Sequence, residues 1–321
     1  MRDGILDTIG SPLVRLPAPD GAAIAAKLES FNPGGSAKDR PAVAMIESAE
    51  AAGVLEPGDH VIEATSGNTG IGLSMVCAAR GYALTIVMPS SKSTERRQLM
   101  AAYGTDIELV DGDMGDARDR ADAVAAETDG VRLHQFEDPA NPRAHYETTG
   151  PEILDELDGY TVDAFVAAVG TGGTITGVGR RLREAFPDVE IVGVEPAANA
   201  VLSGDEPGAD DFQGMGPGFV SPNLDQTLLT DVETVALEEA EAECRRLART
   251  EGVLVGQSSG AASVAATRVA ERIADPSIEC PPLPGDRTFS MDGGEPADCP
   301  LVVTVFPDSG ERYLSTGLFE D

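Results

Sequence analysis

The chain has 321 residues, and 41% of them are hydrophobic, enough to pack one large or two smaller domains. Its 23 Lys and Arg residues face 55 Asp and Glu residues, and the net charge of −32 excludes nucleic acids and anionic membranes as expected partners. There is no membrane-spanning run and no signal-peptide segment after Met1, so we expect a soluble cytoplasmic protein. The acidic residues are spread along the chain, which favours a surface adapted to high salt, as in a halophile, over an acidic tail.

Short β-branched segments alternate with longer amphipathic segments along most of the chain. This alternation predicts parallel sheets covered by helices. The expected strands are Ala23–Leu28, Val61–Ala64, Ala83–Met88, Asp106–Val110, Ala164–Val169, Ile191–Glu195 and Leu301–Phe306. The expected helices are an alanine-rich segment after Lys38, Thr69–Arg80, Thr94–Tyr103, Asp116–Thr128, Ile175–Ala185 and Leu237–Thr250.

The alternation is interrupted twice. Ala197–Asp231 is rich in Gly, Pro and Asp and is predicted to form loops, and Asp275–Cys299 is predicted to be a mobile surface insertion. We therefore expect an α/β fold of two doubly wound domains with mainly parallel sheets. The predicted domains are residues 1–145 and 146–321, with early strands able to cross to the second domain.

Four cysteines occur without a CxxC pair, and the three histidines lie far apart, so no metal site is predicted. Cys77 and Cys244 lie in expected helices and are interpreted as buried apolar residues. Cys280 and Cys299 flank the Pro- and Gly-rich insertion. A disulfide between them is an alternative, but a reducing cytosol favours free thiols.

The first of four glycine-rich turns is Asn32-Pro33-Gly34-Gly35-Ser36-Ala37-Lys38-Asp39-Arg40, between the expected strand Ala23–Leu28 and a helix. Lys38 would lie near the helix N-terminus, where the helix dipole disfavours a cation. The dipole and burial both lower a lysine pKa and make its amine nucleophilic. The chain has only two other lysines, Lys27 and Lys92. We interpret Lys38 as a reactive amine, with a solvated surface lysine as the alternative.

The second turn is Thr65-Ser66-Gly67-Asn68-Thr69-Gly70, which follows an expected strand and begins a helix. Hydroxyl, amide and backbone N–H groups at a helix N-terminus suit a carboxylate. The alternative is a helix cap with additional polar residues.

The third turn, Gly170-Thr171-Gly172-Gly173-Thr174, also joins an expected strand to a helix. Backbone N–H groups of such a turn bind phosphate, and the two hydroxyls add donors. The dinucleotide fingerprint G-x-G-x-x-G fails at Ile175, and no G-K-[ST] sequence occurs. The turn therefore predicts a site for a phosphate of another compound, with a ligand-free tight turn as the alternative.

The fourth turn, Gly256-Gln257-Ser258-Ser259-Gly260, matches the hydrolase pattern G-x-S-x-G. That enzyme class needs a histidine after the serine, but the last histidine is His145. We therefore interpret Ser258 as a hydrogen-bonding residue for a ligand ring nitrogen at the start of a helix.

In this order, the four turns resemble the cysteine synthase family of fold-type II pyridoxal-phosphate enzymes, whose fold is tryptophan synthase β-like. The similarity runs from about Thr8 to Thr316, apart from the insertion. The resemblance implies pyridoxal 5'-phosphate as cofactor and a homodimer. It also allows a complex with the C-terminal tail of serine acetyltransferase.

The resemblance assigns roles to residues of each turn. It implies that Lys38 forms a Schiff base with the cofactor and acts as the general base. It implies that the cofactor is also held by Asn68 at its ring hydroxyl, by Gly170, Thr171, Gly172, Gly173 and Thr174 at its phosphate, and by Ser258 at its pyridine nitrogen. For the substrate carboxylate it implies Thr65, Ser66, Gly67, Asn68, Thr69 and Gln135.

The implied reaction converts O-acetylserine and sulfide to cysteine and acetate. A neutral serine at the ring nitrogen suits β-elimination better than transamination. Two alternatives stay within the family: an O-phosphoserine sulfhydrylase and a cystathionine β-synthase. In the first, Lys92 would meet an anionic leaving group, but an exposed loop lysine is the favoured interpretation of this residue. Outside it stand a catalytically silent binding protein, disfavoured because Lys38 is present, and a nicotinamide oxidoreductase, disfavoured by Ile175.

Overall fold

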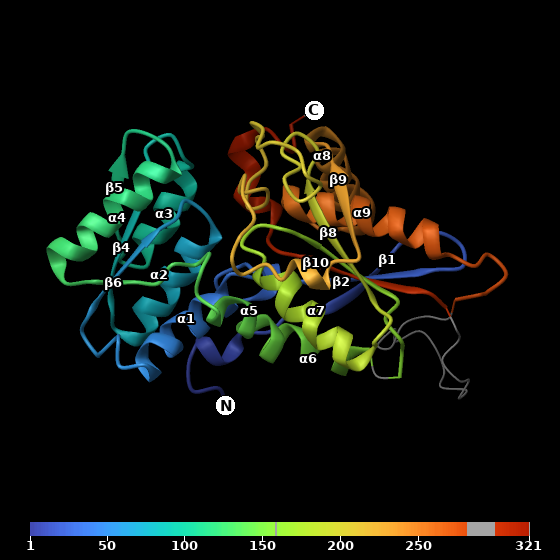
Figure 1. Cartoon of the computed structure of the whole chain (residues 1–321), viewed down its shortest axis with the longest axis horizontal. Coiled ribbons are helices and arrows are strands. Elements are labelled where there is room, and N and C mark those ends of the chain that lie inside the picture. Colours follow the sequence, from blue (N-terminus) through green and yellow to red (C-terminus); the bar gives the residue numbers. More distant parts are fainter. Residues whose placement is uncertain (158, 281–298, 321) are drawn as a thin grey trace.

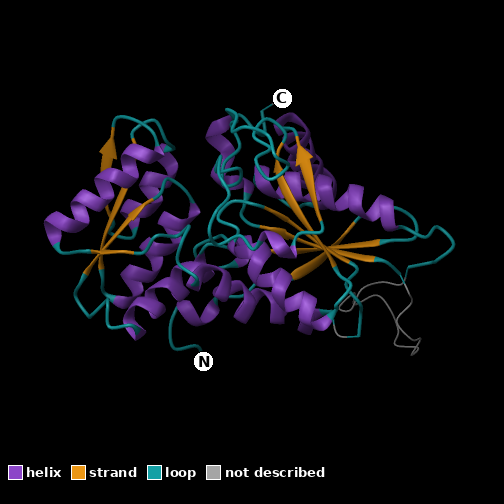
Figure 2. Cartoon of the chain, viewed as in Figure 1, coloured by secondary structure: helices purple, strands orange, loops and turns teal. Residues whose placement is uncertain are grey.

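The computed structural model describes residues 1–157, 159–280 and 299–320, and it has an α/β architecture with two sheets (Figures 1 and 2). The smaller sheet has the order β5-β4-β3-β6 and is parallel throughout. The larger has the order β1-β2-β10-β7-β8-β9, and only β1 pairs antiparallel, with β2. The strands are β1 Leu13–Leu16, β2 Ala23–Leu28, β3 His60–Ala64, β4 Ala83–Pro89, β5 Asp106–Val110, β6 Val131–Arg132, β7 Ala164–Ala168, β8 Glu190–Pro196, β9 Asp231–Val235 and β10 Leu301–Phe306.

Helices cover the sheets and connect their parallel strands. The α-helices are α1 Asp39–Ala51, α2 Asn68–Arg80, α3 Thr94–Ala102, α4 Met114–Thr128, α5 Ala140–Ala144, α6 Gly150–Glu156, α7 Gly173–Ala185, α8 Leu237–Arg246 and α9 Gln257–Ile273. The shorter 3₁₀ and π turns are η1 Leu6–Thr8, η2 Glu29–Phe31, η3 His145–Thr149, η4 Gln226–Leu228, η5 Leu247–Glu251 and η6 Gly310–Thr316. None of these described helices has both the length and the apolarity needed to cross a bilayer.

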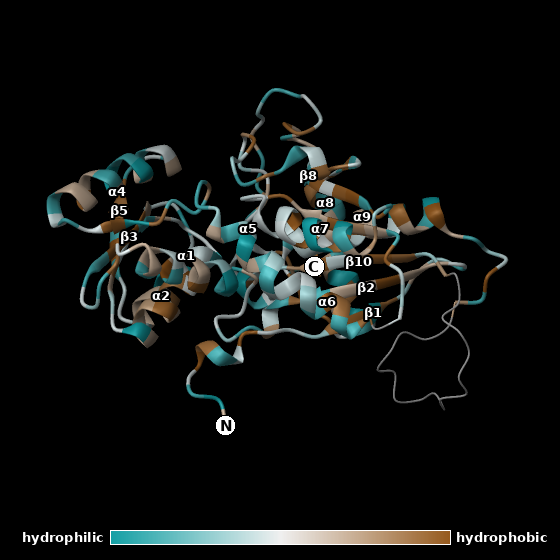
Figure 3. Ribbon diagram, turned by 60° about the horizontal axis from the view of Figure 1, so that its bottom comes forward, coloured by the Kyte–Doolittle hydropathy of each residue, from teal (hydrophilic) through white to brown (hydrophobic). Residues whose placement is uncertain are grey.

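The central strands of the larger sheet are buried on both faces. Every residue of β2 and β10 is buried, because α8 and α9 pack on one face and α6 and α7 on the other. Figure 3 shows these two strands as mainly apolar segments. Burial on both faces explains why they appear in the sequence as continuous apolar runs.

The predicted fold class is confirmed, and β2, β5 and β10 have the predicted bounds. The expected helix to Thr250 instead changes at Leu247 into the π turn η5. Strands β1, β6 and β9 and helices α5 and α6 were outside the predicted elements, and these strands are short, half-exposed or at an edge. The helix expected to begin at Ser258 is α9. β1 and β2 lie in the larger sheet with strands that follow residue 163, while the domain division near residue 145 stays a prediction.

The expectation of free thiols at Cys280 and Cys299 was wrong, whereas Cys77 and Cys244 are free and buried as predicted. Cys280 and Cys299 form a disulfide with their Cα atoms 5.3 Å apart. Both pack against the apolar cluster under β10, so the start of that strand brings the two sulfurs together. The predicted mobile insertion lies largely outside the described residues.

Replacing Cys299 by Ser is expected to lower the free energy of unfolding by about 3 kcal/mol under oxidising conditions, because the disulfide closes a short loop and so restricts the unfolded chain. Denaturant unfolding with and without a thiol reductant measures this. The two chains should unfold alike in reductant. Equal stability in oxidising buffer would contradict a formed disulfide.

Candidate active site

The four glycine-rich turns meet at one cavity of about 620 Å³. The cavity lies at the carboxyl ends of β3, β7 and β10, the edge at which parallel sheets bind ligands. Its lining includes every predicted site residue except Gly173: Lys38, Thr65, Ser66, Gly67, Asn68, Thr69, Gln135, Gly170, Thr171, Gly172, Thr174 and Ser258. Gly173 is the first residue of α7, directly beside this lining.

Lys38 is the N-cap residue of α1, as its turn predicted, and is half-buried at the cavity wall. Burial lowers the pKa of its amine to about 8, and the negative charge of Asp308 opposes that shift. At neutral pH about a tenth of such an amine is unprotonated, whereas an ordinary lysine is almost fully charged. Lys38 can therefore act as a nucleophile or as a general base.

The Thr65–Thr69 turn joins β3 to α2, and a hydrogen bond to Gln135 holds it in place. The hydroxyl of Thr69 donates to Gln135 Oε1 at 2.6 Å, and both side chains are buried. The Gln135 carbonyl accepts from Asn141 and Asn223 at 2.8 and 3.0 Å. The structure thus brings Gln135 to the predicted carboxylate site, and its neighbours hold it there.

The Gly170–Thr174 turn joins β7 to α7, the predicted strand-to-helix junction for phosphate. A Cβ at Gly173 would lie 1.9 Å from Asn141 Oδ1, so only glycine fits there. Asn141 Nδ2 donates to the Thr171 hydroxyl at 3.0 Å, and Ser221 Oγ donates to the Thr171 carbonyl at 2.7 Å. The turn is therefore held open at a helix N-terminus, where backbone N–H groups favour an anion.

His145 supports the same turn and was not predicted as a site residue. Its Nε2 lies 3.2 Å from the Thr174 hydroxyl and its Nδ1 lies 2.9 Å from the Thr149 hydroxyl. Burial lowers the pKa of His145 well below its ordinary value, and the nearby charges of Lys38 and Arg40 lower it further. A neutral ring between two hydroxyls positions Thr174 without adding charge.

Ser258 lies in the first turn of α9, is buried, and lines the cavity. The preceding Gly256 is the N-cap, and a Cβ there would lie within 2.3 Å of both the Tyr313 ring and Asp308 Oδ1. The close approach of residues 308 and 313 therefore requires glycine before the Ser258 turn.

Asp308 and Arg312 were also outside the prediction, although both lie beside Asn68. Asn68 Nδ2 donates to Asp308 Oδ2 at 2.7 Å, and Arg312 Nη1 donates to Asn68 Oδ1. Tyr313 donates its hydroxyl proton to the same Asp308 oxygen at 2.9 Å. The sequence separation of 240 residues between Asn68 and Asp308 explains why no local pattern indicated the pair.

The mouth of the cavity carries exposed positive charge. Lys92 and Arg118 line it and are exposed, whereas Arg96 lines it and is buried. The Arg96 guanidinium lies 5.6 Å from the centre of the Tyr313 ring. The structure is compatible with both interpretations of Lys92, as an exposed loop lysine and as a contact for an anionic leaving group, because this exposed side chain also lines the cavity.

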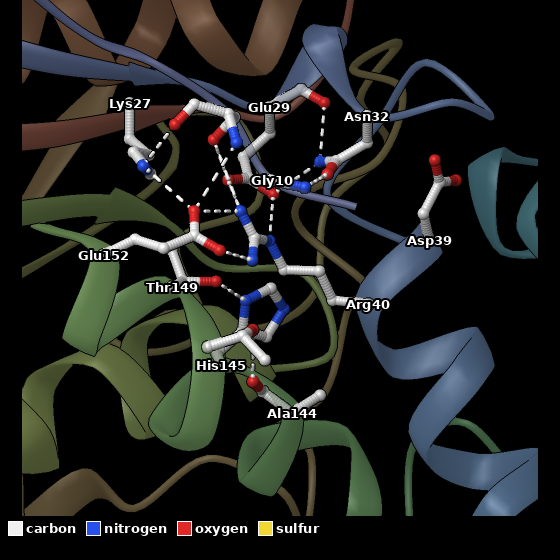
Figure 4. A network of polar contacts seen from close by, with 12 residues as sticks. Gly10, Lys27, Glu29, Asn32, Asp39, Arg40, Ala144, His145, Thr149 and Glu152 are labelled. Atoms are coloured by element: carbon white, nitrogen blue, oxygen red, sulfur yellow. Dashed lines mark hydrogen bonds and ion pairs between the residues drawn. The ribbon is translucent and has the colours of Figure 1, made fainter. Parts of the chain in front are cut away.

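A buried charge network lies behind the Lys38 turn (Figure 4). Arg40 stands between two carboxylates, donating from Nε to Glu29 at 2.7 Å and from Nη1 to Glu152 at 2.6 Å. Lys27, which is fully buried, lies 3.0 Å from Glu152 and also pairs with Glu156. The network joins β2, α1 and α6, so it fixes the start of α1 and with it Lys38.

The cavity meets the requirements of an aromatic aldehyde phosphate. It has a phosphate turn at a helix N-terminus, a reactive amine at Lys38, an amide at Asn68 and a neutral hydroxyl at Ser258. Asn141 packs closely against Gly173 and so supports the phosphate turn from outside the cavity lining.

Comparisons with known proteins agree with this arrangement. The family model described as "Pyridoxal-phosphate dependent enzyme" matches residues 5–278. A cysteine synthase of Staphylococcus aureus is 45% identical, covering 99% of this chain and 97% of its own. An O-ureido-L-serine synthase of Streptomyces lavendulae is 42% identical, covering 99% and 93%. The crystal structure of a cysteine synthase from Entamoeba histolytica has a TM-score of 0.89 at 35% identity, covering 100% and 91%.

Proposed function

Since the chain belongs to the cysteine synthase family of pyridoxal-phosphate dependent enzymes, we propose that it converts O-acetylserine and sulfide to cysteine and acetate. The observation that carries this proposal is the cavity that joins the Lys38 amine, the Gly170–Thr174 turn and the Thr65–Thr69 turn. It offers separate places for a phosphate, a covalently attached ring and a substrate carboxylate.

In this proposal, Lys38 binds the cofactor through its amine, and the Gly170–Thr174 turn holds the phosphate. Asn68 donates an N–H to the ring hydroxyl, and Ser258 faces the ring nitrogen. When bound, the cofactor withdraws electrons from the substrate α-carbon and so makes its proton removable. The hydroxyl of Ser258 leaves the ring nitrogen without a charged partner, which suits elimination at the β-carbon.

The substrate carboxylate is proposed to lie against the Thr65–Thr69 turn, with Gln135 behind it. The substrate amine would first take the place of Lys38 on the cofactor. The freed Lys38 amine can then remove the α-proton as general base, and acetate leaves from the β-carbon. Hydrosulfide forms the new carbon–sulfur bond there, and Lys38 returns the proton to the α-carbon. Closure of the Thr65–Thr69 turn over the substrate would exclude water during these steps.

The leaving group and the sulfur donor define the competing functions. Lys92 lines the cavity with a positive charge, which would attract the phosphate of O-phosphoserine more strongly than an acetyl group, because phosphate carries more negative charge. O-phosphoserine is therefore the first alternative substrate to test. Replacing Lys92 by Met is expected to reduce kcat/KM for O-phosphoserine more than for O-acetylserine. An unchanged ratio between the two substrates would exclude Lys92 from leaving-group recognition.

The proposal also includes two partners. We propose that the protein forms a homodimer and that the C-terminal tail of a serine acetyltransferase binds in the same cavity.

The visible absorption spectrum of the purified protein in high salt tests the proposed reaction. The band of the bound cofactor is expected to move to longer wavelength with O-acetylserine and to return when sulfide is added. A response only to O-phosphoserine, or only to serine with homocysteine, would assign one of the alternatives. The likeness to an O-ureido-L-serine synthase makes other nucleophiles the next to assay. Absence of a band after addition of pyridoxal phosphate would contradict the proposal.

A further inference from the structure

The orientation of the Asn68 amide is determined by its two neighbours. A carboxylate only accepts hydrogen bonds and a guanidinium only donates them. Asp308 therefore binds the Nδ2 end of Asn68 at 2.7 Å, and Arg312 binds the Oδ1 end. An amide nitrogen carries two N–H bonds, and this contact uses one of them. The second N–H is left for a ligand in the cavity that Asn68 lines.

Asp308 is placed to act on a second cavity residue, Lys38. The two line the same cavity, and the adjacent backbone is tied together, since Ala37 N–H donates to the Pro307 carbonyl at 2.8 Å. The Asp308 side chain is 1% exposed, so water screens its charge poorly. Its Oδ1 atom is buried and has no hydrogen-bond donor among the described residues. Such a carboxylate is costly to bury unless nearby positive charge compensates it.

We propose that Asp308 is a positioning residue of this active site, whose carboxylate orients the Asn68 amide toward the cofactor and sets negative charge beside the Lys38 amine. The inference rests on the proposed cofactor contacts of Asn68 and Lys38 but not on the choice of substrate. By orienting Asn68, Asp308 controls the hydrogen bond to the ring hydroxyl of the cofactor. By its charge, Asp308 limits how far burial neutralises the Lys38 amine.

The groups around Asp308 come from several elements. Those that interact with Asp308 itself are Lys38 at the start of α1, Cys244 of α8, and Arg312 and Tyr313 of η6. One group further away, Asp39 of α1 and Arg96 of α3 interact with Arg312. Burial raises the pKa of Tyr313 well above its ordinary value and that of Cys244 to about 12, so both stay neutral near pH 8. Burial also raises the pKa of Asp39 to about 7. Asp39 is therefore the neighbour whose titration overlaps that of Lys38.

The test is the titration of Lys38 in the cofactor-free full chain. The lysines are methylated with isotope-labelled formaldehyde, and NMR then records the signal of Lys38 as a function of pH. The chain has three lysines, and the Lys38 signal is the one lost in Lys38→Ala. Asp308→Asn removes the negative charge that favours the ammonium form. The Lys38 midpoint is therefore expected to move about one pH unit lower. In the cofactor-bound protein, the pH at which the visible band titrates is expected to move in the same direction.

Tyr313→Phe is the matched control, because it removes one hydrogen bond to Asp308 but leaves its charge and its contact with Asn68. Both midpoints should stay with those of the unaltered chain. Asp39→Asn separates the contribution of the overlapping carboxyl group. Should Asp308→Asn not fold, Asp308→Ser makes the same test, since it also removes the charge.

Unchanged midpoints in a folded Asp308 variant would overturn the inference. Failure of the unaltered chain to bind the cofactor would instead contradict the proposed function. The Lys38 measurement in the cofactor-free chain would still decide whether Asp308 acts on Lys38.

Discussion

Replacing Lys38 by Ala is expected to lower kcat/KM by about 10⁴-fold, the upper range for loss of a general base, because covalent attachment of the cofactor is lost as well. The visible band that depends on this attachment should disappear. Pyridoxal phosphate should still bind weakly through the phosphate turn. Steady-state cysteine formation and equilibrium dialysis with the cofactor measure the two effects.

Lys38→Arg is the control for charge. Arginine keeps the positive charge but does not lose its proton at the pH of the assay, so it can serve neither as nucleophile nor as base. We expect Lys38→Arg to be as inactive as Lys38→Ala. A small primary amine added to Lys38→Ala should restore part of the proton transfer. Substantial activity in Lys38→Arg would show that the charge, and not the free amine, is what the reaction needs.

Replacing Arg40 by Met is expected to lower the free energy of unfolding by about 3–5 kcal/mol, because it leaves Glu29 buried without its charged partner. Glu29 is fully buried and accepts from Arg40 Nε and Nη2 at 2.7 and 2.8 Å. Denaturant unfolding at neutral pH measures the change. The matched control is Arg272→Met, which removes an exposed pair with Glu190 and should cost at most about 1 kcal/mol.

The pH dependence gives this prediction a second test. Burial alone would raise the pKa of Glu29, but Arg40 and the donors Ser11 and Asn32 outweigh it and hold the pKa below the ordinary 4.5. In the unaltered chain, Glu29 therefore adds stability above pH 4.5 that is lost as the pH falls through its lowered pKa. Without Arg40, burial raises the pKa of Glu29, so the ionised carboxylate lowers stability at neutral pH instead of adding to it. The stability gap between the two chains should narrow toward pH 4.5, and a constant gap would contradict the argument.

The predictable parts of the site are those built from consecutive residues. Turns such as Gly170–Thr174 combine a strand end, glycines and a helix start within a few positions, so residue types alone indicated their chemistry. Asp308 could not be found in this way, because it follows β10 of the larger sheet, whereas Asn68 begins α2 after β3 of the smaller sheet. His145 likewise reaches Thr174 through the packing of η3 on α7. Short edge strands such as β9 lack the two-sided burial that made β2 and β10 recognisable.

The place of β10 in the larger sheet has a consequence for synthesis of the protein. β2, complete at residue 28, pairs on one side with β10, which begins at residue 301. The four strands of the smaller sheet lie between residues 60 and 132, so that sheet can form while the ribosome is still translating the rest. The Lys38 turn must wait for Pro307, which accepts the Ala37 N–H. A nascent chain should therefore be unable to bind its cofactor productively until it is almost fully released.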